Sequence, residues 1–324
     1  MRMVLAAGVL FMGCAGSSTS DGGASPPAPG HFTFSVGDRV FRMEARVGAS
    51  RQDVSAALER FGTGTRDRWL IASVDGAHLV LSTDRLACSL GECLAIAPAD
   101  LSTLTLVTPG GMEVSLEGTP AVSTAGDAVI YPSQEGPHET DLWLTRKSGL
   151  GWGAATLLTA ASSAAYNSMP ALRFDGQRVL FDCGMQPYPE SGGNDACQVN
   201  LDTSGFQVLA RSTSLPNARF DFVQFPHDSV DGVLLQGSWP IGADSPETVW
   251  LFPASGAPVD IGRNFSNAVS PCGLRDGRFG LLWLARPENT AGLHELTLVA
   301  RDGTLLGVLT PDVDVADIGI GCSD

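Results

Sequence analysis

The cysteines are the residues with the clearest chemistry in this chain of 324 residues. One of them, Cys14, follows an apolar N-terminal stretch, and six others remain in the body of the chain. An even number of cysteines favours disulfides when the protein is exported to an oxidising compartment. By position they fall into three natural pairs: Cys88 with Cys93, Cys183 with Cys197, and Cys272 with Cys322. Six cysteines allow many other pairings, so this pairing is a prediction.

A metal cluster is the alternative use of these thiols. Structural zinc sites are usually built from closely spaced ligands such as CxxC or HxxxH, and the sequence contains neither spacing. The histidines are scattered along the chain, at His31, His78, His138, His227 and His294. We therefore expect disulfides, and neither a metal site nor a cofactor.

Acid–base chemistry has two weak candidates. His138, in GPHETD, and His227, in PHDSVD, lie beside carboxylates in segments that read as loops. Either could act as a general acid or base, although loop histidines are mostly solvated. The motifs HExxH, GxSxG with a credible triad, GxGxxG after a strand and the Walker loop are all missing. The sequence therefore names no catalytic residue.

Calcium and ligand stacking are two further hypotheses. The alternating Asp312, Asp314 and Asp317 do not follow the order of an EF-hand loop, and the pattern is more typical of a half-exposed strand. Most of the tryptophans fall in predicted strands and are expected in the core. Trp152 and Trp239 lie in turn-rich segments and could face a ligand.

The composition excludes several classes of protein. The formal net charge is −15, which disfavours nucleic-acid binding because that rests on Lys and Arg neutralising phosphates. With 44% hydrophobic and only 17% charged residues, the chain is not of the disordered class. Abundant Gly and Pro between short Val/Leu/Ile/Thr runs favour many short strands joined by tight turns.

The N-terminus reads as an export signal. Arg2 precedes an apolar run over residues 3–12, which is much shorter than the roughly 20 residues of a membrane-spanning helix. Phe11-Met12-Gly13-Cys14 resembles the lipobox of bacterial lipoproteins, although Phe11 and Met12 depart from its usual residues. The resemblance implies lipidation of Cys14, and Ala15 in place of Asp implies sorting to the outer membrane. An ordinary signal peptide with an incidental cysteine is the alternative.

Three regions follow from this interpretation: a signal peptide at 1–13, a flexible Ser/Gly/Pro tether at 14–30 and one folded domain at 31–324. The tether contains no core-forming residues. Its residues 15–30 span about 20–25 Å as a coil, at about 5–6 Å × √n. The lipid anchor would be the protein's sole link to the membrane.

An internal repeat organises the folded domain. Residues 120–131 (PAVSTAGDAVIY), 170–181 (PALRFDGQRVLF) and 70–81 (LIASVDGAHLVL) align without gaps, with Gly76, Gly126 and Gly176 in register. Residues 271–282 add Gly277, and a degenerate fifth unit is anchored by Gly232, with its first strand expected at 221–225. Each unit reads as strand, tight glycine turn, strand, because glycine accepts the positive φ of such a turn.

Two further apolar runs follow each repeat, so each period holds four strands. Four antiparallel strands per period of 45–50 residues are typical of a propeller blade. We therefore predict an all-β fold, a β-propeller; a pair of β-sandwiches is the alternative. The repeats resemble those of TolB-like (WD-type) propellers, whose consensus includes Ser-x-Asp-Gly before the second strand. The match is incomplete, because Ser123 lacks the Asp and Arg173 replaces Ser.

Five repeats are visible, and the two chain ends supply a sixth. Strands within 31–47 and an inner strand in the tail from Val313 to Cys322 would together close a ring of six four-stranded blades. A disulfide between Cys272 and Cys322 would then join the first strands of the last two blades. Residues 50–61 predict one short helix with Ser50 as its N-cap.

Function is read from these features together. The anchor, the tether, the repeats and the missing catalytic motifs favour a non-enzymatic, monomeric binding module of the bacterial cell envelope, facing the periplasm or the surface. Its partner would be an envelope protein or a cell-wall component. The alternative is a calcium-dependent hydrolase or lactonase, or a sugar-oxidising enzyme, by analogy with other six-bladed propellers.

Overall fold

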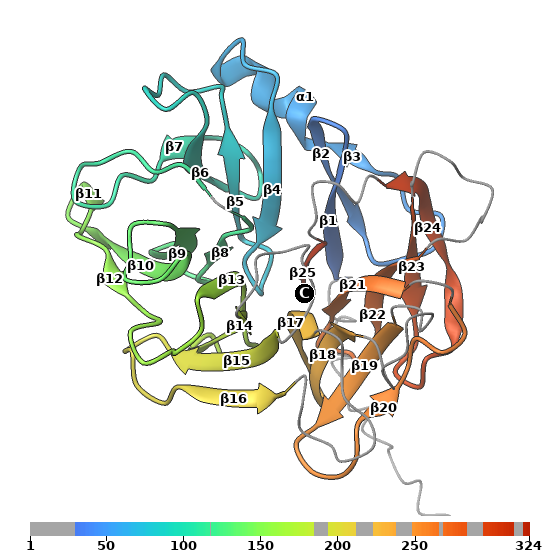
Figure 1. The fold of residues 1–324 in the computed structure, drawn as a ribbon. Helices are drawn as coiled ribbons and strands as arrows, with labels where there is room; N and C mark the ends of the chain where they lie inside the picture. The colour runs from blue at the N-terminus through green and yellow to red at the C-terminus, as the bar shows by residue number, and fades with distance from the viewer. Residues whose placement is uncertain are drawn as a thin grey trace, which may run out of the picture.

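The fold is a ring of blades around a central axis (Figure 1). This computed structural model describes residues 30–116, 118–184, 194–211, 223–237, 248–265, 268–283, 294–313 and 320–324. Within these residues the strands form six antiparallel sheets, one per blade. The all-β, six-bladed propeller predicted from the repeats is confirmed.

The first three blades follow the chain in order. Blade 1 contains β4 (Asp67–Ala72), β5 (His78–Thr83), β6 (Cys93–Pro98) and β7 (Thr105–Leu106). Blade 2 contains β8 (Ala121–Val122), β9 (Ala128–Ser133), β10 (Asp141–Ser148), β11 (Gly151–Trp152) and β12 (Thr156–Leu157). Blade 3 contains β13 (Tyr166–Leu172), β14 (Arg178–Gly184), β15 (Asp195–Asn200) and β16 (Gln207–Ala210).

The last three blades complete the ring. Blade 4 contains β17 (Val223–Ser229), β18 (Gly232–Gly237), β19 (Thr248–Pro253) and β20 (Val259–Asp260). Blade 5 contains β21 (Ala268–Gly273), β22 (Phe279–Trp283), β23 (His294–Val299) and β24 (Leu305–Val313). Blade 6 contains β25 (Gly321–Ser323) inside β1 (His31–Val36), β2 (Arg39–Glu44) and β3 (Gln52–Asp53).

The two ends of the described chain close the ring, as the sequence predicts. β25 pairs with β1 in antiparallel register, with Phe32 opposite Cys322. Within the described part of the tail, Val313 belongs to β24 and Gly321–Ser323 pair with β1, while positions 314–319 lie outside the described residues. A disulfide joins Cys272 of β21 to Cys322 of β25, so the innermost strands of blades 5 and 6 are covalently linked.

The short helix is present, but its predicted start is wrong. Helix α1 spans Val54–Leu58 and continues as a 3-10 turn over Glu59–Phe61. Its N-cap is Asp53, whose Oδ1 accepts a hydrogen bond from the backbone N–H of Ala56 at 2.9 Å. Ser50 lies too early, because Gln52–Asp53 first pair with β2 as the outermost strand of the blade.

The repeated glycines make the turns between the first two strands of their blades. Gly76, Gly126 and Gly176 have φ values of +70°, +64° and +65°, where a side chain would be strained. Ser73 Oγ stabilises the first of these turns: it donates to Asp75 at 2.7 Å and accepts from the His78 N–H at 3.0 Å. The corresponding turns of blades 1 to 5 lie at one end of the ring, which we call the turn face.

Apolar clusters fill the seams, meaning the interfaces between neighbouring blades. Among the described residues each of the six seams contains one such cluster. Phe32 and Phe34 are fully buried between blades 5 and 6, and Phe181 is fully buried between blades 2 and 3. Full burial of one such side chain contributes about 1.5–3 kcal/mol. The hydrophobic core of the described residues therefore consists of six clusters, one at each interface between blades.

Candidate functional site

The inner strands surround a narrow cavity on the ring axis, which we call the central channel. Its volume is about 50 Å³, and its walls are largely apolar, with Ile71, Val122, Met169 and Leu172 among the lining side chains. Small-molecule sites usually have about 300–1,000 Å³. This channel therefore has room for a few water molecules and not for a substrate.

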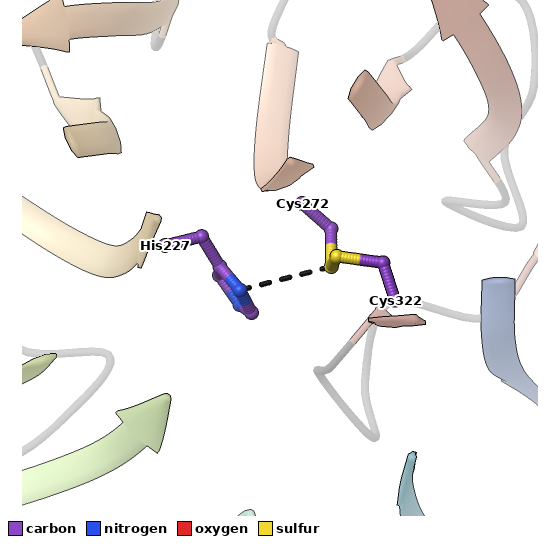
Figure 2. Close-up of side chains that lie close together, drawn as sticks. All are labelled: His227, Cys272 and Cys322. Atoms are coloured by element: carbon purple, nitrogen blue, oxygen red, sulfur yellow. Dashed lines mark hydrogen bonds between the residues drawn. A yellow bond between two sulfur atoms is a disulfide. The ribbon is translucent and has the colours of Figure 1, made fainter. Parts of the chain in front are cut away.

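His227 lies in the channel against the disulfide that closes the ring (Figure 2). Its Nδ1 is 3.7 Å from Cys272 Sγ, and a disulfide sulfur carries no hydrogen, so the contact requires the proton on Nδ1. Burial lowers the pKa of His227 from 6.5 to about 4. The imidazole is therefore neutral at pH 7.

This arrangement corrects the sequence interpretation of His227. The residue lies in β17 and not in a loop, because the first strand of blade 4 spans Val223–Ser229 and not 221–225. Its neighbour Asp228 faces Arg173 of blade 3 instead of pairing with the imidazole. His227, Cys272 and Cys322 are close enough to share a metal ion, but both sulfurs are used in the disulfide and cannot act as thiolate ligands.

Polar atoms in the channel wall are partly unsatisfied. Ser270 Oγ and Ser323 Oγ are buried, line the channel and have no hydrogen-bond partner among the described residues. Thr119 Oγ1 donates to Met169 Sδ at 3.4 Å. Buried hydroxyl groups of this kind are usually satisfied by ordered water, which suits the volume of the channel.

Charged and aromatic groups surround the mouth of the channel on the turn face. Asp228 accepts hydrogen bonds from Arg173 Nε at 3.0 Å and from the backbone N–H of Phe174 at 2.7 Å. The Arg275 guanidinium lies 5.6 Å from the centre of the Phe174 ring, and Arg275 Nε is 3.3 Å from the Asp324 carboxylate. Burial raises the pKa of Asp324 despite this ion pair.

The second candidate acid or base, His138, lies in a loop beside a carboxylate, as predicted. Its Nδ1 is 2.8 Å from Asp141 Oδ1. The fully buried Asp141 also accepts hydrogen bonds from Thr159 Oγ1 at 2.5 Å and from Asn167 Nδ2 at 3.3 Å. The carboxylate thus organises the loop, and the Thr159 hydroxyl is already donated to it instead of being available as a nucleophile.

Of the other sequence candidates, the structure describes only some. The disulfides Cys88–Cys93 and Cys183–Cys197 are present. Trp152 is mostly buried in the seam between blades 1 and 2, with Lys147 over its ring, and both side chains line a cavity of about 240 Å³. Cys14, Trp239, Asp314 and Asp317 lie outside the described residues, as does the side chain of Asp312.

Sequence reasoning missed the residues at the channel mouth, above all Arg173, Phe174 and Asp228. One signal was available: Arg173 stands where the repeat usually has a serine. Ser73 and Ser123 hydrogen-bond within their own turns, whereas Arg173 reaches a carboxylate in the next blade. A departure from the repeat thus marked a contact between blades.

The described helices include none that is long and apolar enough to span a membrane. No protein-family model matches the chain, and no curated protein matches it.

Solved structures give the clearest likeness. The chain superposes on TolB from Acinetobacter baumannii with a TM-score of 0.61 and 11% identity, covering 91% of this chain and 66% of that one. The hydrazine synthase of Kuenenia stuttgartiensis gives a TM-score of 0.59 at 12% identity, covering 89% of this chain and 45% of that one. A chain of the nidogen/laminin complex gives a TM-score of 0.53 at 7% identity, covering 91% of this chain and 97% of that one.

At such low identities these likenesses establish the fold alone. They include proteins with different activities, as expected for a scaffold that hosts many functions. Together with the six closed sheets, they show that this chain has the six-bladed β-propeller fold of TolB-like proteins.

Proposed function

We propose that the protein is a non-enzymatic binding module of the bacterial cell envelope that holds a protein or cell-wall partner on its turn face. The observation that carries this proposal is the size of the central channel, about 50 Å³. Since a substrate does not fit into the channel, a ligand bound at the ring axis would lie across the mouth and not inside the ring. The TolB-like fold, shared with proteins of several functions, is compatible with such a role.

The mouth provides groups suited to a protein partner. Phe174 is partly exposed and lines the channel, with the Arg275 guanidinium against its ring. Aromatic and arginine side chains are enriched at protein–protein interfaces, where they supply area, stacking and directed hydrogen bonds. We infer that a partner covers Phe174 and Arg275 and displaces water from the channel mouth.

The proposal includes attachment to the outer membrane through Cys14. After removal of residues 1–13, the lipidated cysteine would be joined to blade 6 by the tether, which reaches about 20–25 Å as a coil. The ring begins with β1 at His31, so a tethered protein would meet partners close to the membrane surface. Lipidation and the tether rest on the sequence features of the N-terminus alone.

Cross-linking in intact cells tests this function. The wild type and Cys14→Ala are cross-linked and purified, and the co-purifying proteins are identified by mass spectrometry. We expect one specific envelope partner with the wild type, and its loss when Cys14→Ala releases the protein into the soluble fraction. Absence of a specific partner with the wild type would contradict the binding function.

The enzymatic alternative makes an opposite prediction. A calcium-dependent hydrolase or lactonase would gain thermal stability with calcium and lose it with EDTA, because a ligand that binds the native state raises its melting temperature. The binding module predicts the same melting temperature in both. A shift of several degrees with calcium would favour the enzyme.

A further inference from the structure

A second cavity lies away from the ring axis, on blade 6 at the turn face, where Arg42 reaches across the seam to the Gly76 turn of blade 1. Its volume is about 370 Å³, within the range of small-molecule sites. The lining side chains come from β1, β2 and the segment leading to β3, and include His31, Arg42, Glu44 and Arg46. We call this cavity the seam pocket. Figure 1 shows β1 and β2 beside β4 at this seam.

The seam pocket is rich in positive charge in a protein that has little of it. The whole chain has a formal net charge of −15, yet this cavity is lined by two arginines against one carboxylate. Arg46 Nη2 pairs with Glu44 at 3.0 Å. The guanidinium of Arg42 is left as the uncompensated charge.

Arg42 has no carboxylate within ion-pair distance among the described residues. Its one hydrogen bond is from Nη2 to the backbone oxygen of Gly76, at a long 3.4 Å, and its Nε is buried without a partner. Burial lowers the pKa of the guanidinium. An uncompensated, partly buried charge is costly, and a bound anion would remove that cost.

His31 also carries a buried polar atom, Nδ1, without a hydrogen-bond partner among the described residues. Burial and the nearby Arg42 lower the pKa of His31, so the ring is neutral at pH 7 but can still donate a hydrogen bond from one nitrogen. The pocket thus combines a guanidinium that lacks a carboxylate partner with a second unsatisfied polar group.

We propose that the seam pocket binds the phosphate group of a small phosphate ester, with Arg42 as its principal ligand and His31 and Arg46 as supporting donors. A planar guanidinium binds phosphate oxygens through two parallel charge-assisted hydrogen bonds. The volume leaves room beside the phosphate for an organic group of modest size. The proposal concerns a site separate from the channel mouth and does not depend on the proposed partner.

The phosphate ester could be a soluble metabolite or a lipid headgroup, and two binding assays distinguish these sources. Isothermal titration calorimetry uses inorganic phosphate and glycerol 3-phosphate as probes of the soluble form. Sedimentation uses vesicles of phosphatidylcholine with and without phosphatidylglycerol as probes of the headgroup. Both assays use the folded chain from residue 14 onward, without its lipid.

The decisive variant is Arg42→Gln, with Arg146→Gln as the matched control. Arg146 is an exposed residue of β10 in blade 2, so the control removes the same charge at a distant place. We expect Arg42→Gln to weaken binding about 10- to 100-fold, as for the loss of a hydrogen bond to a charged group. Arg146→Gln should bind like the wild type. Arg42→Lys, which retains the charge but not the fork, should bind with intermediate affinity.

Each result supports or overturns the proposal. Binding of glycerol 3-phosphate that is lost in Arg42→Gln supports a soluble ligand. Binding only to vesicles with phosphatidylglycerol, again lost in Arg42→Gln, supports a headgroup. No binding in either assay, or equal binding by Arg42→Gln and the wild type, overturns it. Circular dichroism of Arg42→Gln must match that of the wild type, and Arg42→Lys provides the comparison should Arg42→Gln fail to fold.

Discussion

Two seams of the propeller place an arginine between blades near the turn face. One arginine is paired with a carboxylate, and the other is not. In the seam between blades 3 and 4, Arg173 pairs with Asp228 at 2.7 Å and donates to Gln198 Oε1 at 3.1 Å. In the seam between blades 6 and 1, the partner of Arg42 within the described part of the chain is the backbone oxygen of Gly76 alone. The charge of Arg173 is therefore compensated within the protein, whereas that of Arg42 is not and is left available for a ligand.

His227, in the central channel, avoids the charge altogether. His227, beside the disulfide between blades 5 and 6, remains neutral because its pKa is lowered to about 4. A buried ionisable group can be paired, neutralised or left uncompensated, and only the last state suggests an absent ligand. Arg42 therefore differs both from the paired Arg173 and from the neutral His227.

The largest expected effect comes from opening the ring at blade 6. The variant Cys272→Ser with Cys322→Ser should lose about 4 kcal/mol of unfolding free energy, because this disulfide closes a loop of 50 residues. The control is Cys88→Ser with Cys93→Ser, whose sequence separation of 5 predicts a loss of about 2 kcal/mol. Urea denaturation measures both, and equal losses would contradict the role of Cys272–Cys322 in closure.

The second-largest effect is expected when the ion pair between Arg173 and Asp228 is broken. Asp228→Ala leaves Arg173 without a carboxylate and should cost about 3 kcal/mol, near the lower end for breaking a buried pair because Arg173 is partly exposed. Asp231→Ala removes a more exposed partner, that of Arg301, and should cost about 1 kcal/mol or less. If the two variants unfold at the same urea concentration, the Arg173–Asp228 pair does not stabilise its seam.

The neutral His227 in the channel predicts that stability depends on pH. The unfolded chain protonates His227 at its ordinary pKa of 6.5, whereas the folded chain does so at about 4. The unfolded state therefore binds more protons between these values, and stability falls as the pH decreases from 6.5 to 4. We expect His227 to account for about 2 kcal/mol of this loss, allowing for partial screening in the channel. In His227→Gln, the unfolding free energy should fall by that much less between pH 6.5 and 4. The same pH dependence in the variant and the wild type would contradict the role of His227.

The smallest effect is expected at the unpaired seam. Without phosphate, Arg42→Gln should leave the unfolding free energy unchanged or raise it by up to about 1 kcal/mol, since it removes a charge that nothing compensates. A loss of 3 kcal/mol, comparable to that of Asp228→Ala, would show that Arg42 stabilises its seam in the same way as Arg173.

The sequence predicted the fold because the repeat is local. A glycine at each turn, with apolar runs on both sides, defines two strands within a dozen residues. The spacing of these units along the chain then shows that each blade contains four strands. The helix start was wrong because pairing of Gln52–Asp53 with β2 is a tertiary contact that shifts the cap from Ser50 to Asp53.

The candidate sites were harder to predict for the same reason. The seams join residues that are far apart in sequence, such as Arg173 with Asp228 and Arg42 with Gly76. Whether Arg42 has a carboxylate beside it depends on how two blades pack, which periodicity does not encode. The proximity of His227 to Cys272 likewise arises only when the ring has formed.

The most direct test of a partner on the turn face is site-specific photo-cross-linking in cells. A photoreactive residue replaces Gln177, which is exposed on the turn face of blade 3, or Gln134, which is exposed at the opposite end of blade 2. The binding function predicts a discrete adduct from position 177 and none from position 134. An adduct from position 134 alone would place the partner on the other face and contradict the account.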